Sequence, residues 1–413
     1  MPADQQADYA AIEFQAGSVF TPGAPINERD LFSGRIQQIQ SILQAISQRG
    51  YHAVMFGERG VGKTSLSNVL AAFLGRVRQN YLLPRVNCDS TDTFSSLWKK
   101  ALQDIVVSKK KPGMGFNAEE IETAQSVVEN LPDEITPDDV RRVLSDLSKG
   151  IVLVVVFDEF DRIQDRAVTV TMADTIKGLS DYSVSATIVL IGVADSIDDL
   201  IEGHQSVERA IVQVPMPRMS PQEIKQIVMT GLSRLKMGIA PEALDEIANL
   251  SQGLPYITHL LALQSVRAAL VAKKMKIESS HVEVGMKNAL DQWQQSIKTA
   301  YYQATKSQQP DNLFKEVLLA CALAAIDELG YFTAASVRTP LNLITAHKYD
   351  IPTFARHLKE FSEHARGPII ERVGTARRLR YRFRSPLMRP YIVMRGFADG
   401  ILSRETLKRI QEG

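Results

Sequence analysis

Eight consecutive residues have the types and spacing of a phosphate-binding loop. The run Gly57-Glu58-Arg59-Gly60-Val61-Gly62-Lys63-Thr64 fits the pattern G-x-x-x-x-G-K-[ST] at every required position. Glycines accept positive φ angles, and successive backbone N–H groups can surround oxyanions. Lys63 is expected to reach the β- and γ-phosphates, and the Thr64 hydroxyl to bind Mg²⁺. The pattern predicts a site for a nucleoside triphosphate with Mg²⁺, contacted by Gly57, Gly60, Val61, Gly62, Lys63, Thr64 and Ser65.

Two acidic residues follow a strand-like run later in the chain. Residues 151–157 are unbroken apolar and mostly β-branched, which is typical of a strand covered on both faces in a parallel sheet. The run is followed by Asp158 and Glu159, at the end of a strand where ligands bind in this class of sheet. We expect Asp158 to hold Mg²⁺, directly or through water. Glu159 is expected to orient or deprotonate the attacking water.

Two further residues are candidates for catalysis. Asp195 follows the strand-like run 187–193, where a polar side chain can polarise the nucleophilic water; an N-cap for residues 197–200 is the alternative. Arg209 precedes the short strand 211–214 and can stabilise charge on a γ-phosphate held by a neighbouring subunit. A surface ion pair is the alternative for Arg209.

These candidates lie within an alternation of strands and helices. Helix-like segments at 34–48, 65–74 and 93–107 alternate with strand-like runs at 51–56, 82–88, 151–157, 187–193 and 211–214. This order predicts a parallel α/β/α fold. Residues 1–19 are polar and expected to be loosely ordered. Residues 108–115 are predicted to be a loop, and residues 116–149 a charged helical insert.

From Ser220 onward the pattern becomes helical. Ser220, Pro221 and Glu223 form a helix start with an N-cap, a proline at N1 and an acid at N3. Further helices are predicted at 241–251, 255–273 and 279–303, and, after a polar linker at 304–311, at 312–328, 333–346 and 352–364. Two strand-like runs, 368–373 and 379–383, then flank a turn. Three helices followed by a hairpin are typical of a winged helix.

Composition excludes several classes of protein. The 413 residues carry a formal net charge of +1, and no apolar run reaches 18 residues, so no membrane span is predicted. The N-terminal segment lacks the pattern of a secretory signal. Cys88 and Cys321 lie far apart and fit neither a disulfide framework nor a zinc site. A reducing, cytoplasmic setting is therefore expected.

Positive charge is concentrated near the C-terminus. Residues 366–395 contain nine arginines and one acid, Glu371. If this region is a winged helix, its second half offers contacts to the backbone and bases of duplex DNA. The candidates are Arg356 on the predicted helix and Arg377, Arg378, Arg380 and Arg382 on the hairpin. A protein-docking or autoinhibitory role for the same basic surface stays open.

The motifs together resemble the AAA+ superfamily of P-loop ATPases, and specifically its initiator-like and STAND-like branch. The carrying residues include GERGVGKTS at 57–65, VVVFDEFD at 154–161, LIGVADS at 190–196 and SQGLPYITHLL at 251–261. The resemblance implies an ATPase core, a helical lid and an appended winged helix. The corresponding bounds are an arm at 1–19, the core at 20–219, the lid at 220–303, a linker at 304–311, the winged helix at 312–398 and a tail at 399–413.

The resemblance also implies further site residues. It places Gly34 and Arg35 near the adenine base and Pro255 in the nucleotide site, and it implies ATP rather than GTP. One departure matters, because Tyr256 stands where related lids carry an arginine that touches the γ-phosphate. This difference favours a switch that holds its nucleotide and hydrolyses it slowly.

We therefore predict an ATP-binding and ATP-hydrolysing molecular switch that requires Mg²⁺. ATP is expected to bind between core and lid and to drive assembly into a homo-oligomer through Arg209. In the first reading the switch acts on duplex DNA. In the alternative it is a signalling protein whose winged helix docks on a protein partner or holds the switch closed.

Overall fold

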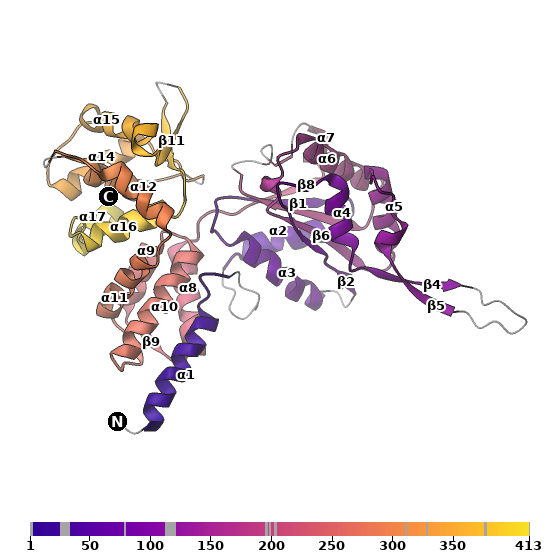
Figure 1. Cartoon of the computed structure of the whole chain (residues 1–413), viewed down its shortest axis with the longest axis horizontal. Helices are drawn as coiled ribbons and strands as arrows, with labels where there is room; N and C mark the ends of the chain where they lie inside the picture. The colour runs from indigo at the N-terminus through magenta and orange to yellow at the C-terminus, as the bar shows by residue number, and fades with distance from the viewer. Residues whose placement is uncertain are drawn as a thin grey trace, which may run out of the picture. The chain divides into compact units, whose positions relative to one another are not determined.

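The computed structural model describes residues 3–24, 34–77, 80–111, 121–194, 197, 200–201, 205–309, 312–327, 329–375 and 378–412. The chain forms two compact units (Figure 1). Unit 1 comprises Met1–Gly34, Glu58–Gly62 and Pro217–Gly413, and unit 2 comprises Arg35–Gly57 and Lys63–Met216. Unit 2 therefore corresponds to most of the predicted ATPase core. The predicted lid and the region after it belong to one unit.

Unit 2 is built on a parallel sheet, as the sequence predicts. Its strands run in the order β2-β6-β7-β1-β8, and β3 also pairs with β6. Their bounds are β1 His52–Phe56, β2 Tyr81–Leu82, β3 Arg85–Asn87, β6 Val152–Asp158, β7 Ala186–Gly192 and β8 Ile211–Pro215. Every residue of β7 and nearly every residue of β6 is buried, which explains their apolar composition.

Helices cover both faces of this sheet. Helices α2 (Ile36–Ser47) and α3 (Lys63–Val77) pack together beside β7, while α4 (Phe94–Leu102) and α6 (Arg166–Asp181) contact each other elsewhere on the sheet (Figure 1). Helix α5 (Pro137–Leu147) packs on α6, and the short α7 (Gln205–Glu208) precedes β8. Because α3 begins at Lys63, the glycine loop joins the end of β1 directly to a helix N-terminus.

The prediction for residues 108–149 is confirmed only in its second half. Strands β4 (Val106–Lys111) and β5 (Ile121–Ser126) pair as an antiparallel hairpin that is separate from the main sheet, in place of the start of the expected loop and part of the expected helical insert. Among the described residues of the insert, the helical ones are those of a 3-10 turn at Val127–Asn130 and of α5. Both strands carry β-branched residues, which favour strands. That preference explains the hairpin, although the charged residues of the segment are typical of a solvated helix.

Unit 1 contains the helices of the predicted lid. They are α8 (Pro221–Arg234), α9 (Pro241–Ser251), α10 (Pro255–Val271), α11 (Ser279–Asp291) and α12 (Gln295–Thr305), with β9 (Gly238–Ile239) and β10 (Lys276–Ile277) as a short parallel pair. Ser220 caps α8 through the predicted capping box with Glu223. The single helix expected at 279–303 is two helices, because the chain breaks around the buried Trp293.

The remaining part of unit 1 has the element order predicted for residues 312–398. Helices α13 (Phe314–Leu323), α14 (Ala334–Thr345) and α15 (Ile351–Phe361) precede a hairpin of β11 (Ile370–Val373) and β12 (Arg380–Phe383). We call residues 312–398 the C-terminal region. Its last helix, α16 (Met388–Ala398), packs against α9, α11 and α12 of the lid. This packing explains why the two predicted domains form one unit.

The N-terminal residues are helical, contrary to expectation. They form α1 (Ala3–Val19), which packs on α10 (Figure 1). Phe20, just after α1, is in edge contact with His259. The predicted C-terminal tail contains α17 (Arg404–Glu412), which packs on α14. Ala16 and Val19 on α1 and Leu407 on α17 are buried. No helix among the described residues is long and apolar enough to cross a membrane.

Candidate functional site

The backbone of the glycine loop has the shape that phosphate binding requires. Gly57, Gly60 and Gly62 have φ angles of 148°, 87° and 96°, so each expected positive φ is present. At Gly57 a side chain would also collide with the Met216 carbonyl. The Lys63 ammonium group is buried and donates a hydrogen bond of 2.8 Å to the Gly57 carbonyl oxygen. This hydrogen bond holds the Lys63 side chain across the loop in which it is expected to bind phosphate.

The predicted metal ligands lie together in unit 2. Asp158, at the end of β6, is only 3% exposed, and its carboxylate accepts a hydrogen bond from the Thr64 hydroxyl. Burial raises the pKa of Asp158, while hydrogen bonds from Thr64 and the Glu159 N–H and the charge of Arg85 act in the opposite direction. A hydroxyl beside a carboxylate fits Mg²⁺, which takes few protein oxygens and completes its shell with phosphate and water.

Sequence reasoning missed the cation that partners Asp158. The Arg85 guanidinium lies 3.7 Å from the Asp158 carboxylate and also donates to the Asn68 side chain. Burial is the main cause that lowers the pKa of Arg85. The register of β3 on β6 sets Asn87 opposite Asp158 and Arg85 two residues earlier. A polar residue in a strand beside β6 was the signal that could have revealed this pairing.

The predicted catalytic base is engaged by a neighbour. Glu159 has a left-handed backbone, with φ 57° and ψ 36°, at the start of the short turn Phe160–Arg162. Its carboxylate forms an ion pair of 2.8 Å with Arg162, and its side chain is 49% exposed. Glu159 is thus near Asp158 in sequence, but in this structure its oxygen is directed to Arg162. Sequence reasoning gave Arg162 no role.

The residues carried over from the family resemblance are found in different settings. Pro255 begins α10 and lies in van der Waals distance of the position where Gly62 would bear a side chain. Gly34, with φ 77°, is packed so closely on Glu223 that a side chain would meet its carboxylate. Arg35 is 3% exposed and also has a left-handed backbone, with φ 60°. Val61 is buried, and Ser65 is half-buried in the first turn of α3.

A second polar cluster, within unit 1, holds the tip of the glycine loop. The Glu58 carboxylate accepts a hydrogen bond of 2.7 Å from Arg218, and their side chains are 11% and 16% exposed. Arg218 also donates to the carbonyl of Gln252, just before α10. In the C-terminal region, Gly330 approaches so closely that a side chain there would collide with Glu58. The loop tip is therefore in contact with both the lid and the C-terminal region.

Arg389 adds a buried cation to this cluster. It lies on α16, is 8% exposed, and donates to the carbonyls of Ala322 and Ala324 at the end of α13. Burial lowers the pKa of Arg389; nearby Arg218 lowers it further and Glu58 raises it. Arg389 thus links the packing of the C-terminal region to the charge of the loop residue Glu58.

Two predicted catalytic residues are not brought into a site. Asp195 lies outside the described residues. Arg209, between α7 and β8, is exposed and has no side-chain partner within the part of the chain that the structure describes. Its exposure is compatible with a role toward a second molecule, which stays a prediction.

Most of the predicted nucleic-acid contacts are ion-paired within the protein. Arg356 pairs with Glu360, Arg380 with Asp327 and Arg382 with Glu371, at 2.6, 3.1 and 2.6 Å. Arg380 and Arg382 also lie over the Tyr331 ring. Arg378 is exposed, and Arg377 lies outside the described residues. Within residues 366–395, Arg366, Arg380, Arg382 and Arg395 each pair with an acid, so the positive charge of the segment is offset in part.

The parallel sheet and the glycine loop at a helix N-terminus define a P-loop NTPase fold. The family model described as "Novel STAND NTPase 1" matches residues 25–339. The chain therefore belongs to this family of STAND NTPases. A comparison with curated proteins finds no match.

Several solved structures are similar to this chain. The ORC2 protein of Aeropyrum pernix, solved in ADPNP–ADP complexes, is 13% identical, covers 95% of this chain and 97% of its own, and has a TM-score of 0.50. Cdc6p of Pyrobaculum aerophilum is 13% identical over 95% and 98% of the two chains, with a TM-score of 0.47. A Walker-type ATPase of Pyrococcus abyssi is 14% identical over 91% and 99%, with a TM-score of 0.49. At these identities the likeness concerns the fold alone.

Proposed function

We propose that the protein is an ATP-binding switch. In this switch Glu58 couples the conformation of the glycine loop to the lid and the C-terminal region. The observation that carries this proposal is the contact of Glu58 with Arg218 and Gly330. Glu58 lies inside the loop motif, one residue after Gly57. A phosphate group that reorganises the loop amides must therefore change the setting of Glu58. The two partners of Glu58 then transmit that change to the rest of unit 1.

The glycine loop and the residues expected to hold the metal supply the binding chemistry. Loop N–H groups and the Lys63 ammonium would bind the phosphates, and Thr64 with Asp158 would hold Mg²⁺, which neutralises developing negative charge when bound. Glu159 would accept a proton from the attacking water or orient it. Because Glu159 is paired with Arg162, it must first exchange that partner. This requirement, with Tyr256 in place of a lid arginine, supports slow hydrolysis.

Breaking the Glu58–Arg218 ion pair is expected to speed nucleotide release. We expect Glu58→Gln, which keeps the shape and removes the charge, to raise the release rate of a fluorescent ADP analogue about tenfold. The reason is that this pair is largely buried, so the loss of one partner leaves the other charge buried and unpaired. The conformation of the loop that the pair holds is then destabilised. Stopped-flow fluorescence measures the rate. Arg218→Gln should act similarly, and the double variant should not add to the single effects.

The matched control is Glu283→Gln, which removes an exposed ion pair with Lys287 on α11. This variant should release nucleotide at the wild-type rate, because exposed pairs contribute little. If Glu58→Gln also stays within twofold of wild type, then Glu58 does not couple the loop to unit 1, and the switch proposal is wrong.

For the C-terminal region, we propose a winged helix that acts on the protein itself or on a protein partner. The ion pairs of Arg356, Arg380 and Arg382 support this reading, because those charges are already compensated. DNA binding is the second candidate. It is supported by the exposed arginines Arg372, Arg378 and Arg384 on and beside the hairpin.

We expect only weak, non-specific binding to duplex DNA. In gel-shift titrations at 150 mM salt the dissociation constant should exceed about 1 µM, the range of non-specific contacts. Removing one exposed charge with Arg378→Gln should change it little. Nanomolar binding with a steep salt dependence that Arg378→Gln reduces would establish the DNA reading instead.

Two further parts of the proposal concern assembly and location. We propose that ATP promotes a homo-oligomer in which Arg209 reaches the nucleotide of a neighbour; its exposure supports this role. We also propose a cytoplasmic location, which the two free, buried cysteines Cys88 and Cys321 support.

A further inference from the structure

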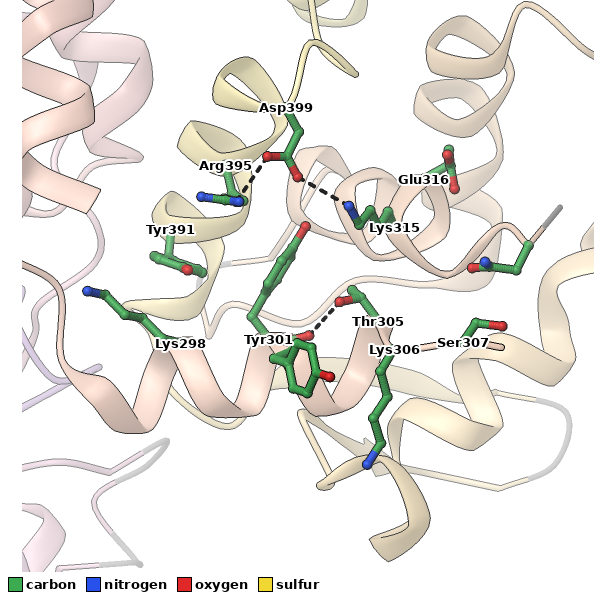
Figure 2. Close-up of a pocket in the computed structure, with 12 residues that line it drawn as sticks. Lys298, Tyr301, Thr305, Lys306, Ser307, Lys315, Glu316, Tyr391, Arg395 and Asp399 are labelled. Carbon is green, nitrogen blue, oxygen red and sulfur yellow. Dashed lines mark hydrogen bonds and ion pairs between the residues drawn. The ribbon is translucent and has the colours of Figure 1, made fainter. Parts of the chain in front are cut away.

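A hollow lies in unit 1, well away in sequence from the glycine loop. Helices α12, α13 and α16 surround a volume of about 600 Å³ (Figure 2). Sites for small molecules commonly have volumes of roughly 300–1,000 Å³. The hollow therefore has the size for a metabolite, and none of the roles assigned above uses it.

Cations dominate the lining of this hollow. Lys298, Lys306, Lys315 and Arg395 are among its lining residues, together with the two acids Glu316 and Asp399; the Lys298 and Lys306 side chains extend away from Lys315 and Arg395 (Figure 2). Asp399 accepts from Arg395 at 3.1 Å and from Lys315 at 3.4 Å, so one carboxylate holds two cations in place (Figure 2). Lys298 is engaged with the Asp291 carbonyl. The ammonium group of Lys306 has no partner in the described part of the chain.

Two neutral hydrogen-bond donors add to the preference of the hollow for an anionic ligand. Tyr301 and Tyr391 are 9% and 5% exposed, and their rings pack edge to face with centroids 5.5 Å apart. Burial raises the pKa of both hydroxyls, which therefore stay protonated at neutral pH and can donate hydrogen bonds. The Tyr301 side chain rises from α12 toward Arg395 and Asp399 (Figure 2).

One acceptor in the hollow is left unsatisfied. Glu316 Oε2, on α13, is buried and has no hydrogen-bond partner within the described residues. A buried carboxylate oxygen without a donor is costly. If the Glu316 side chain turns toward the hollow, an O–H or N–H group on a ligand would satisfy this oxygen, and negative charge on the ligand would meet the lysines and the arginine.

We propose that this hollow binds a small phosphate monoester that also carries hydroxyl or amino donors. Its phosphate would lie against Lys315 and Arg395, the Lys306 side chain would turn from its position in Figure 2 to reach it, and Glu316 would turn to accept from a donor group. A neutral ligand would leave the excess of positive charge uncompensated. Sugar phosphates and nucleoside monophosphates share this chemistry and serve as the two probes.

The helices that line the hollow determine what a bound ligand would do to the protein. α12 ends at Thr305 and α13 begins at Phe314, so the lining helices flank the predicted linker at 304–311. A ligand that contacts α12, α13 and α16 together would fix the C-terminal region against the last lid helix. In a switch of the proposed kind it would act as an effector; this step rests on the proposed function, whereas binding itself does not.

Calorimetry on the full-length Lys63→Ala variant tests the proposal without interference from the glycine loop. Adenosine monophosphate, glucose 6-phosphate and inorganic phosphate are titrated separately. We expect at least one organic monoester to bind with a dissociation constant below 1 mM and to bind tighter than inorganic phosphate. Adding Lys306→Gln should weaken that binding about tenfold or more, the usual effect of losing one charge-assisted hydrogen bond.

Controls separate a local effect from loss of folding. Lys306 has an exposed side chain, so its replacement should leave the circular dichroism spectrum and melting temperature unchanged. Lys287→Gln, an equal charge change on α11 outside the hollow, should bind the monoester as well as its parent. If no monoester binds at millimolar concentration, or if Lys306→Gln and Arg395→Gln both bind unchanged, the inference is overturned.

A parallel titration of the wild-type protein with ATP keeps this inference distinct from the proposed function. ATP binding without monoester binding would overturn the hollow as a site and leave the switch standing. Monoester binding to Lys63→Ala, with no ATP binding to the wild type, would support the hollow and refute the switch.

Discussion

Replacement of Lys63 by alanine should weaken ATP binding by at least about a hundredfold. The loop contributes one side-chain cation to the expected phosphate site, and charge-assisted hydrogen bonds are worth roughly 1.5–3 kcal/mol each. Lys63 is expected to contact two phosphates, so both contacts would be lost together. Isothermal titration of wild-type and variant protein with ATP and Mg²⁺ gives the two dissociation constants directly.

The matched control is Lys177→Ala. Lys177 lies on α6 of the same unit, and its side chain is exposed. This variant should bind ATP like the wild type. The hydrogen bond from Lys63 to Gly57 is also lost in Lys63→Ala, so the melting temperature of each variant should be compared. A folded Lys63→Ala protein that retains wild-type affinity would refute the phosphate-site assignment.

Hydrolysis should be far slower when Glu159 becomes glutamine. A positioned general base contributes typically 10²–10⁴-fold, so we expect a loss of turnover in that range. Affinity for ATP should stay within about threefold, because Glu159 is not among the residues expected to bind phosphate or metal. Single-turnover assays with radiolabelled ATP separate the chemical step from product release.

A control for this experiment is Glu134→Gln, an exposed acid of unit 2 outside the sheet. It should hydrolyse ATP at the wild-type rate. Equal rates in Glu159→Gln and the wild type would show that Glu159 is not the catalytic base, and that its ion pair with Arg162 is not released for catalysis. Glu159 would then be a structural residue of the turn after β6.

The parts of the fold that sequence could predict are those that depend on local pattern. The glycine loop needs eight adjacent residues, and β6 needs only an apolar run with an acid at its end. Helix starts such as Ser220 carry their signal within four residues. The β4–β5 hairpin was missed because β4 is rich in lysine and the two strands pair outside the main sheet, so no apolar run like that of β6 marks them in the sequence.

The parts that sequence could not predict depend on pairs distant in the chain. Arg85 reaches Asp158 only because β3 and β6 are neighbours, and Glu58 meets Arg218 across 160 positions. The basic segment shows the same limit. A count over residues 366–395 excludes Asp327 and Glu360, which pair with Arg380 and Arg366 once the chain is folded.

The pairing of Arg85 with Asp158 has a consequence for the order in which ligands arrive. Asp158 already has a guanidinium 3.7 Å away, so a bare dication would be repelled by a cation at its own ligand. The phosphate tail of the nucleotide carries the negative charge that offsets this repulsion. Free Mg²⁺ should therefore have little affinity for the protein, and the metal should enter already chelated by the nucleotide.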